Sequence, residues 1–148
     1  MVAPSGQQAD EDSERLDSMT LIEVRIAPTP AQISAVRVVA ADLAARQDYD
    51  LDAVSDLRMA VDEACATLVP LAVPGTMLSC RFLVAPATIE VLATVEAGHH
   101  VTVPQNTFGW RVLTTLIDEV QAVSSDGAGG GRPMAGIRLC LRRERAGG

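Results

Sequence analysis

The sequence predicts an α+β fold in which helices cover one face of a mixed β-sheet. Three observations lead to this prediction. Apolar residues alternate with polar ones in several short segments, they recur at helical spacing in longer segments, and the two kinds of segment do not alternate as βαβ units do. The chain of 148 residues has the length of one domain and can bury a core without a disulfide or a metal.

The first strand and the first helix are predicted at the start of the folded region. Over 21–28, aliphatic residues alternate with charged ones until Pro28, which predicts a half-buried strand. Over 29–47, apolar residues follow at intervals of three and four. Thr29 is the candidate N-cap and Pro30 fits the first helical position, so this segment is predicted to be an amphipathic helix.

A second helix is predicted to begin after Asp50 or Asp52, since either carboxylate can cap it. We expect it to end near Pro70, because proline disrupts a helix interior. Its apolar residues form one stripe at intervals of three and four, which consists of Val54, Leu57, Val61, Ala64 and Leu68.

The second half of the chain predicts two strands, a helix and a last strand. The strands at 77–84 and 88–96 alternate and are joined by a short hairpin. After a loop, apolar residues over 108–123 recur at helical spacing. The glycines of 127–131 are expected in a hairpin loop that follows a short strand, and 136–143 alternates as the last strand.

Composition argues against several classes of protein. The formal net charge is −7 and the pI about 4.7, the opposite of what direct nucleic-acid binding requires. There is no apolar run of the roughly 18 residues that a membrane span needs. Residues 1–18 are acidic and lack signal-peptide features, so we expect a disordered tail before a single domain over 19–145. Cys65, Cys80 and Cys140 are expected to be reduced, buried thiols.

Glu63 and Thr67 are the residues whose spacing suggests chemistry. They lie four apart on the second predicted helix and outside its apolar stripe, so they share one face. A carboxylate beside a hydroxyl can polarise a nucleophile and bind a hard cation. The alternative is a solvated helix face without a chemical role.

Several segments in this order resemble the RsbW-type family of anti-sigma factors and serine kinases. They are AVDEACATL at 60–68, ATVEAGHH at 93–100, FGWRVLTTLIDEVQAVSSDG at 108–127 and GIRLCLRR at 136–143. Members of this family have the histidine-kinase-like (GHKL, Bergerat) ATPase fold. The resemblance runs from Leu21 to Arg143. It implies a two-layer α/β sandwich with a mixed, mostly antiparallel sheet and three helices on one face.

The resemblance implies that ATP and magnesium bind beside the second helix. Glu63 matches the glutamate that lies by the γ-phosphate in the family and assists phosphoryl transfer, which implies a catalytic role. The family's magnesium ligand is normally an asparagine, and Thr67 stands at that position. Its hydroxyl has a shorter reach, although it remains the candidate magnesium ligand.

The glycine-rich boxes of the family are altered in this chain. Glu96 stands where the family has the aspartate that reads the adenine amino group, Gly98 matches a glycine, and His100 replaces the second one. In the stretch that leads into the third helix, Gly109 is the glycine that remains. The resemblance therefore implies that Glu96, Gly98 and Gly109 bind the cofactor, in a degenerate site where ATP and magnesium bind weakly or not at all.

The resemblance also implies a function and partners. We expect an anti-sigma factor that sequesters an alternative sigma factor by direct binding and is regulated by an anti-anti-sigma protein. Two alternatives stay open: an active ATP-dependent serine kinase that phosphorylates the anti-anti-sigma protein, and an ATP-binding sensor without a sigma partner. A cytoplasmic homodimer that regulates transcription in a stress response is expected. Arg37, Gln32 and Ser34, on the first helix, are the candidate partner-binding residues.

Other features have simpler interpretations. His99 and His100 lack further ligands and are expected to be loop residues rather than a metal site. Trp110 lies on the helical stripe and is expected in the core. The arginines at the end of the chain either bind an acidic partner or protect an exposed edge strand by their charge; they are Arg138, Arg142, Arg143 and Arg145.

Overall fold

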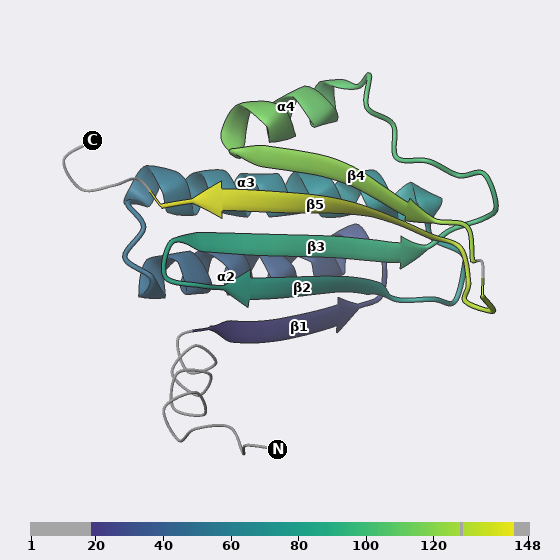
Figure 1. Cartoon of the computed structure of the whole chain (residues 1–148), viewed down its shortest axis with the longest axis horizontal. Coiled ribbons are helices and arrows are strands. Elements are labelled where there is room, and N and C mark those ends of the chain that lie inside the picture. Colours follow the sequence, from purple (N-terminus) through teal and green to yellow (C-terminus); the bar gives the residue numbers. More distant parts are fainter. Residues whose placement is uncertain (1–18, 128, 144–148) are drawn as a thin grey trace, which may run out of the picture.

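The computed structural model describes residues 19–127 and 129–143, which form two layers, a sheet and a layer of helices (Figure 1). This architecture confirms the predicted fold class. The expected disordered tail at 1–18 and the expected end of the domain at 145 lie outside the described residues. In chain order the elements are β1 (Thr20–Ile26), α2 (Pro30–Arg46), α3 (Leu51–Leu68), the 3-10 turn η1 (Val69–Leu71), β2 (Leu78–Val84), β3 (Thr88–Glu96), α4 (Phe108–Leu116), β4 (Glu119–Ser125) and β5 (Met134–Arg142).

The described strands form one sheet in the order β1-β2-β3-β5-β4, and every neighbouring pair is antiparallel. The prediction of a mixed sheet was wrong in this respect. β3 and β4 run in the same direction, but they never pair because β5 returns between them. β1 and β2 are antiparallel because α2 and α3 carry the chain along the sheet and back before β2 begins (Figure 1).

The first two helices begin where the sequence predicts. Thr29 is the N-cap of α2, although its side chain accepts no hydrogen bond there. Asp50, rather than Asp52, caps α3, because its carboxylate accepts a hydrogen bond from the backbone N–H of Ala53 at 2.7 Å. No helix of the described ranges is long and apolar enough to cross a membrane.

The predicted third helix is wrong over its second half. α4 ends at Leu116, and Ile117 already has extended backbone angles of −120° and 142°. Val120, which continues the helical spacing, belongs to β4 and lies opposite Leu139 of β5. The local spacing of this segment fits a helix as well as a strand. It forms a strand because it pairs with β5, and that pairing exists only in the folded sheet.

The last strand is not at an edge. β5 lies between β3 and β4, so the interpretation of its arginines as protection of an exposed edge was wrong. Arg138 donates a hydrogen bond to Glu90 of β3 at 2.6 Å, and Arg142 pairs with Glu119 of β4 at 2.7 Å. These arginines therefore balance carboxylates on the two neighbouring strands.

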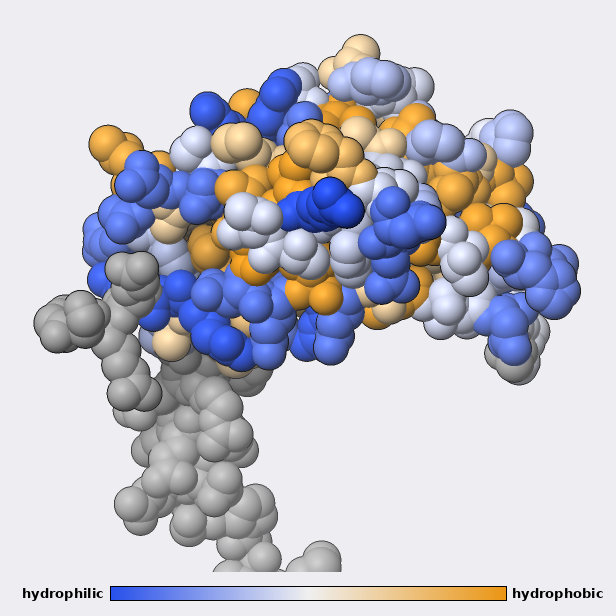
Figure 2. All heavy atoms as spheres, turned by 90° about the horizontal axis from the view of Figure 1, so that it is seen from above, coloured by the Kyte–Doolittle hydropathy of each residue, from blue (hydrophilic) through white to orange (hydrophobic). Residues whose placement is uncertain are grey.

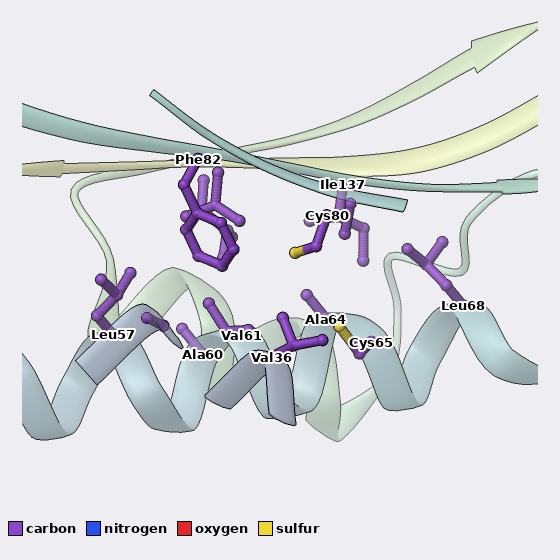
Figure 3. Packing of buried hydrophobic residues seen from close by; sticks show 14 of the residues in the cluster. Val36, Leu57, Ala60, Val61, Ala64, Cys65, Leu68, Cys80, Phe82 and Ile137 are labelled. Atoms are coloured by element: carbon purple, nitrogen blue, oxygen red, sulfur yellow. The ribbon is translucent and has the colours of Figure 1, made fainter. Parts of the chain in front are cut away.

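The core lies between the helices and one face of the sheet. Figure 3 shows the α3 side chains from Leu57 to Leu68 directed at Phe82, Cys80 and Ile137 of the sheet, with Val36 of α2 beside them. The three cysteines are free and buried, as predicted. Trp110 is only partly buried at the margin of this core, where it packs against buried residues.

The other face of the sheet carries no helix of the described chain (Figure 1). Glu90 and Arg138 form their ion pair on this face. A groove of about 360 Å³ lies there, and its lining is mostly apolar, with Leu21, Leu83, Leu92 and Val123 among the residues. The uncovered face is therefore both apolar and charged.

Candidate functional site

Helix α3 fixes the positions of Glu63 and Thr67. Its buried residues, among them Leu57, Ala64 and Leu68, hold one side of the helix against the sheet. Glu63 and Thr67 lie outside that buried set and are half-buried, on the side where α3 meets α4. The structure therefore keeps the carboxylate and the hydroxyl on one side of α3, as the spacing of four residues predicts.

Glu63 lies against the first turn of α4. A Cβ atom on Gly109 would overlap Oε1 of Glu63, so the carboxylate occupies the space that any other residue at position 109 would fill. Thr107 caps α4 and accepts a hydrogen bond from the N–H of Trp110 at 3.1 Å. The structure thus brings together two of the predicted site residues, Glu63 and Gly109, which are distant in the sequence.

The contact places a negative charge at the positive end of a helix. The N–H groups of a first helical turn lack partners inside the helix and carry partial positive charge. A carboxylate at that end stabilises the helix, and glycine allows its close approach. The Glu63 carboxylate therefore lies close to this end of α4.

Glu96 lies apart from this pair. Val95 before it is fully buried under the helices, so strand alternation turns Glu96 to the opposite face of the sheet. There its carboxylate pairs with Arg132 at 2.9 Å, and its side chain is only 19% exposed. Glu96 and Arg132 line a pocket of about 430 Å³ together with Arg25 and other residues of the open face.

The turn after β3 contains the remaining residues of the altered box. Gly98 is exposed, and a Cβ there would meet Val101 only at an ordinary contact distance of 3.5 Å. His100 has a φ of +64°, in the left-handed region that glycine adopts most easily. The histidine therefore keeps a backbone conformation typical of glycine, while its side chain is exposed in the loop, as expected for both histidines.

The described residues, as they are arranged, fit ATP with magnesium poorly. Glu63 fills the space beside Gly109 that a phosphate cradle would leave open, and Glu96 faces away from α3. Within 19–127 and 129–143, no group of three or more His, Cys, Asp or Glu side chains could hold a metal ion. Thr67 would offer magnesium one hydroxyl, and phosphate oxygens and water would have to supply the remaining ligands.

The predicted partner-binding residues lie on the outer side of α2. Arg37 pairs with Asp62 of α3 at 3.5 Å, with both side chains about half exposed. Arg37 and Asp62 line a groove of about 380 Å³ together with Arg58 and Met59. Gln32 and Ser34 are exposed one turn earlier, and the Ser34 hydroxyl donates to the carbonyl oxygen of Ala31.

Val38 adds to this surface, since 67% of it is exposed beside Arg37 on α2. Sequence reasoning missed Val38, Arg58 and Met59. The signal for Val38 was present, because an aliphatic residue outside the apolar stripe of a helix must face solvent. This surface of α2 and α3, which extends from Gln32 on α2 to Asp62 on α3, combines charged groups with exposed apolar side chains, and such a combination suits a protein partner.

A second feature missed at the sequence level is a pair of thiols in the core. Cys65 of α3 and Cys80 of β2 face each other between the two layers (Figure 3). A hydrogen bond with Cys65 raises the pKa of the Cys80 thiol well above its usual range, and burial raises it further. Spacing along the chain contains no signal for this pair.

Another hollow lies at a different end of the fold. A pocket of about 870 Å³ is lined by Tyr49, several aspartates and the end of β5. Burial raises the pKa of Tyr49, whose hydroxyl donates a 3.4 Å hydrogen bond to the carbonyl oxygen of Leu141. None of the predicted site residues lines this pocket.

Comparisons with known proteins place these features in context. No family model matches the chain. It is 35% identical over 150 aligned residues to the anti-sigma-F factor RsbW of Mycobacterium tuberculosis, an alignment that covers 95% of this chain and 86% of that protein. It is 28% identical over 131 residues to the serine-protein kinase RsbW of Bacillus velezensis, covering 74% of this chain and 82% of that one. The corresponding kinase of Bacillus pumilus is 25% identical over 134 residues, with 75% and 83% covered.

Proposed function

Because the chain belongs to the RsbW family, we propose that it is an anti-sigma factor that sequesters an alternative sigma factor by direct protein binding. The observation that carries the proposal is the alignment over 95% of the chain with an anti-sigma-F factor. Sequestration needs a folded binding surface and no chemical turnover. It is therefore compatible with a site in which Glu63 contacts α4 and Glu96 pairs with Arg132.

The outer surface of α2 and α3 is the proposed contact with the partner. Arg37 and Arg58 supply positive charge to a protein of net charge −7, and Val38 and Met59 expose apolar surface next to them. Arginine and methionine are enriched in protein interfaces, whereas isolated surface ion pairs contribute little to stability. A partner segment that carries carboxylates beside an apolar side chain would complement this surface.

We propose two further properties that follow from this role. The sigma factor is released when an anti-anti-sigma protein binds in its place, which makes the chain a regulator of transcription in a stress response. The protein acts in the cytoplasm as a homodimer, where it keeps the sigma factor from RNA polymerase without contacting DNA itself.

The experiment that tests sequestration is a measurement of mass in solution, with the full chain alone and mixed with candidate sigma factors. A complex is expected with one sigma factor, and Arg37→Glu should weaken it at least tenfold. Arg46→Glu is the matched control, since Arg46 lies on the same helix and pairs with Asp42 at its far end. The absence of a complex with every sigma factor of the source organism would reject sequestration and favour the stand-alone sensor.

The second candidate function is an ATP-dependent serine kinase, favoured by the names of the Bacillus relatives and by the match at Glu63. Labelled ATP, magnesium and a cognate anti-anti-sigma protein test it directly. We expect little transfer to serine and a dissociation constant for magnesium-ATP of about 10 μM to 1 mM. Efficient transfer that is lost in Glu63→Ala would establish the kinase and refute a binding role without turnover.

A further inference from the structure

We propose that two copies of this chain associate through the face of the sheet that no helix covers, the open face. This face consists of the strand residues that alternate with the buried ones, and it lies in front of α2 and α3 in Figure 1. The inference rests on the homodimer of the proposed function and names the surface that forms it. An antiparallel sheet can keep one face in water, so the case for a second copy depends on the charges and the apolar groove of this face.

The charge of the open face differs from the charge of the whole chain. Carboxylates and guanidinium groups are equally represented among its strand residues, which include Glu23, Glu90, Glu96, Glu119, Arg25, Arg81, Arg138 and Arg142. The chain as a whole carries −7, so two copies repel each other over most of their surfaces. A two-fold dimer brings the same patch of both copies together, and a patch that carries both signs can complement itself. The open face therefore suits a second copy.

Arg81 is the cation of the open face that lacks a partner within the described residues. It is exposed on β2, opposite Leu92 of β3, and no ion pair or side-chain hydrogen bond of the described chain involves it. The other three arginines named above each lie within 4.0 Å of a carboxylate. Glu90 lines the same groove as Arg81 and contacts Arg138 through Oε1, so its second oxygen can accept a hydrogen bond from Arg81 of the other copy. Two-fold symmetry forms this contact twice.

The open face has the size of a small protein interface. Five strands about 4.8 Å apart, with about seven residues each, cover a footprint of about 500 Å². The relief of the side chains adds to this area, and a standard interface buries about 800 Å² of each partner. The groove of about 360 Å³ supplies an apolar centre, and Leu21 beside it is 57% exposed. Figure 2 shows that hydrophobic and hydrophilic side chains also mix on the α4 side, so the balanced charge and Arg81, rather than the mixture, distinguish the open face.

Sedimentation equilibrium of the full chain over a range of concentrations tests this interface. The unaltered protein should dimerise with a dissociation constant of about 1 to 100 μM, as expected for a small interface. Arg81→Glu and Glu90→Arg should each weaken self-association at least about tenfold, because each brings like charges together. Mixed in equal amounts, the two variants should form a heterodimer, since the acidic face of one then meets the basic face of the other. Arg46→Glu, at an exposed ion pair of α2, is the control and should leave the dimer unchanged.

Circular dichroism first checks that each variant is folded. Glu23→Arg, at a more exposed carboxylate of the same face, replaces Glu90→Arg if that variant does not fold. A chain that stays monomeric at about 200 μM would overturn the homodimer and this interface together. A dimer that Arg81→Glu leaves intact, or folded variants that do not combine when mixed, would overturn this interface alone. Capture of a sigma factor is measured separately, so failure of the interface is distinguishable from failure of sequestration.

Discussion

Replacing Gly109 by alanine should affect stability differently in two backgrounds. In the unaltered protein the new methyl group would overlap Oε1 of Glu63, so either the carboxylate or the first turn of α4 must move. In a Glu63→Ala background the overlapping group is gone. Alanine is then simply a better helix residue than glycine at that position.

The magnitudes follow from these two contributions. The overlapping atoms are the far end of the flexible Glu63 side chain, so turning that side chain aside costs about 0.5 to 1.5 kcal/mol, and the helix preference for alanine over glycine returns about 0.5 to 1 kcal/mol. Gly109→Ala should therefore change the unfolding free energy by less than about 1 kcal/mol in the unaltered protein. It should raise that free energy by about 0.5 to 1 kcal/mol when Glu63 is alanine. The coupling between the two positions is then about 0.5 to 1.5 kcal/mol.

Urea unfolding of the four proteins, followed by circular dichroism and by Trp110 fluorescence, measures this cycle. With a slope of about 2 kcal/mol per molar urea, a change of 1 kcal/mol moves the midpoint by about 0.5 M. Equal changes for Gly109→Ala in both backgrounds, within about 0.3 kcal/mol, would refute the contact between Glu63 and α4.

Three further predictions concern the scaffold. Leu57→Ala, at a fully buried residue of α3, should cost about 2 to 5 kcal/mol in thermal or urea unfolding, whereas Leu51→Ala on the same helix, at an 87% exposed residue, should cost under about 0.5 kcal/mol. A double-mutant cycle on Glu90 and Arg138 should give a coupling of about 0.2 to 1 kcal/mol that shrinks in 1 M salt; an unchanged coupling would contradict a solvent-screened pair. The folded state raises the pKa of the Cys80 thiol, so the stability that this thiol contributes is fully present below the ordinary thiol pKa and is lost as the pH rises above about 9. Cys80→Ala should flatten this fall in the free energy of unfolding. An identical slope in the two proteins would contradict the prediction.

The elements with one clear period were predictable from the sequence. The α3 stripe and the alternation in β3 leave no competing assignment, because each pattern continues through the whole element. The segment that contains Ile117 and Val120 fits both a helix and a strand locally. Its pairing partner, β5, comes later in the chain, so tertiary structure rather than local preference decides that segment.

The candidate site was predictable in part. The shared side of Glu63 and Thr67 follows from their helical spacing alone. The side of the sheet on which Glu96 lies could also have been predicted from the sequence. Val95 belongs to the apolar set that faces the helices, and the next residue in a strand faces the other way. The contact between Glu63 and Gly109 could not be predicted from the sequence, because it depends on how the connection after β3 brings α4 back onto α3.

That connection has a consequence for the scaffold as a whole. α4 is inserted between the end of β3, in the middle of the sheet, and the start of β4, its outermost strand. Within the described residues this stretch adds no strand to the sheet, but it supplies Val103, Leu113 and Ile117 to the core. A longer, glycine-rich loop could therefore be grafted between Glu96 and Glu119 only if it keeps these buried anchors, and the strand pairing would then stay the same.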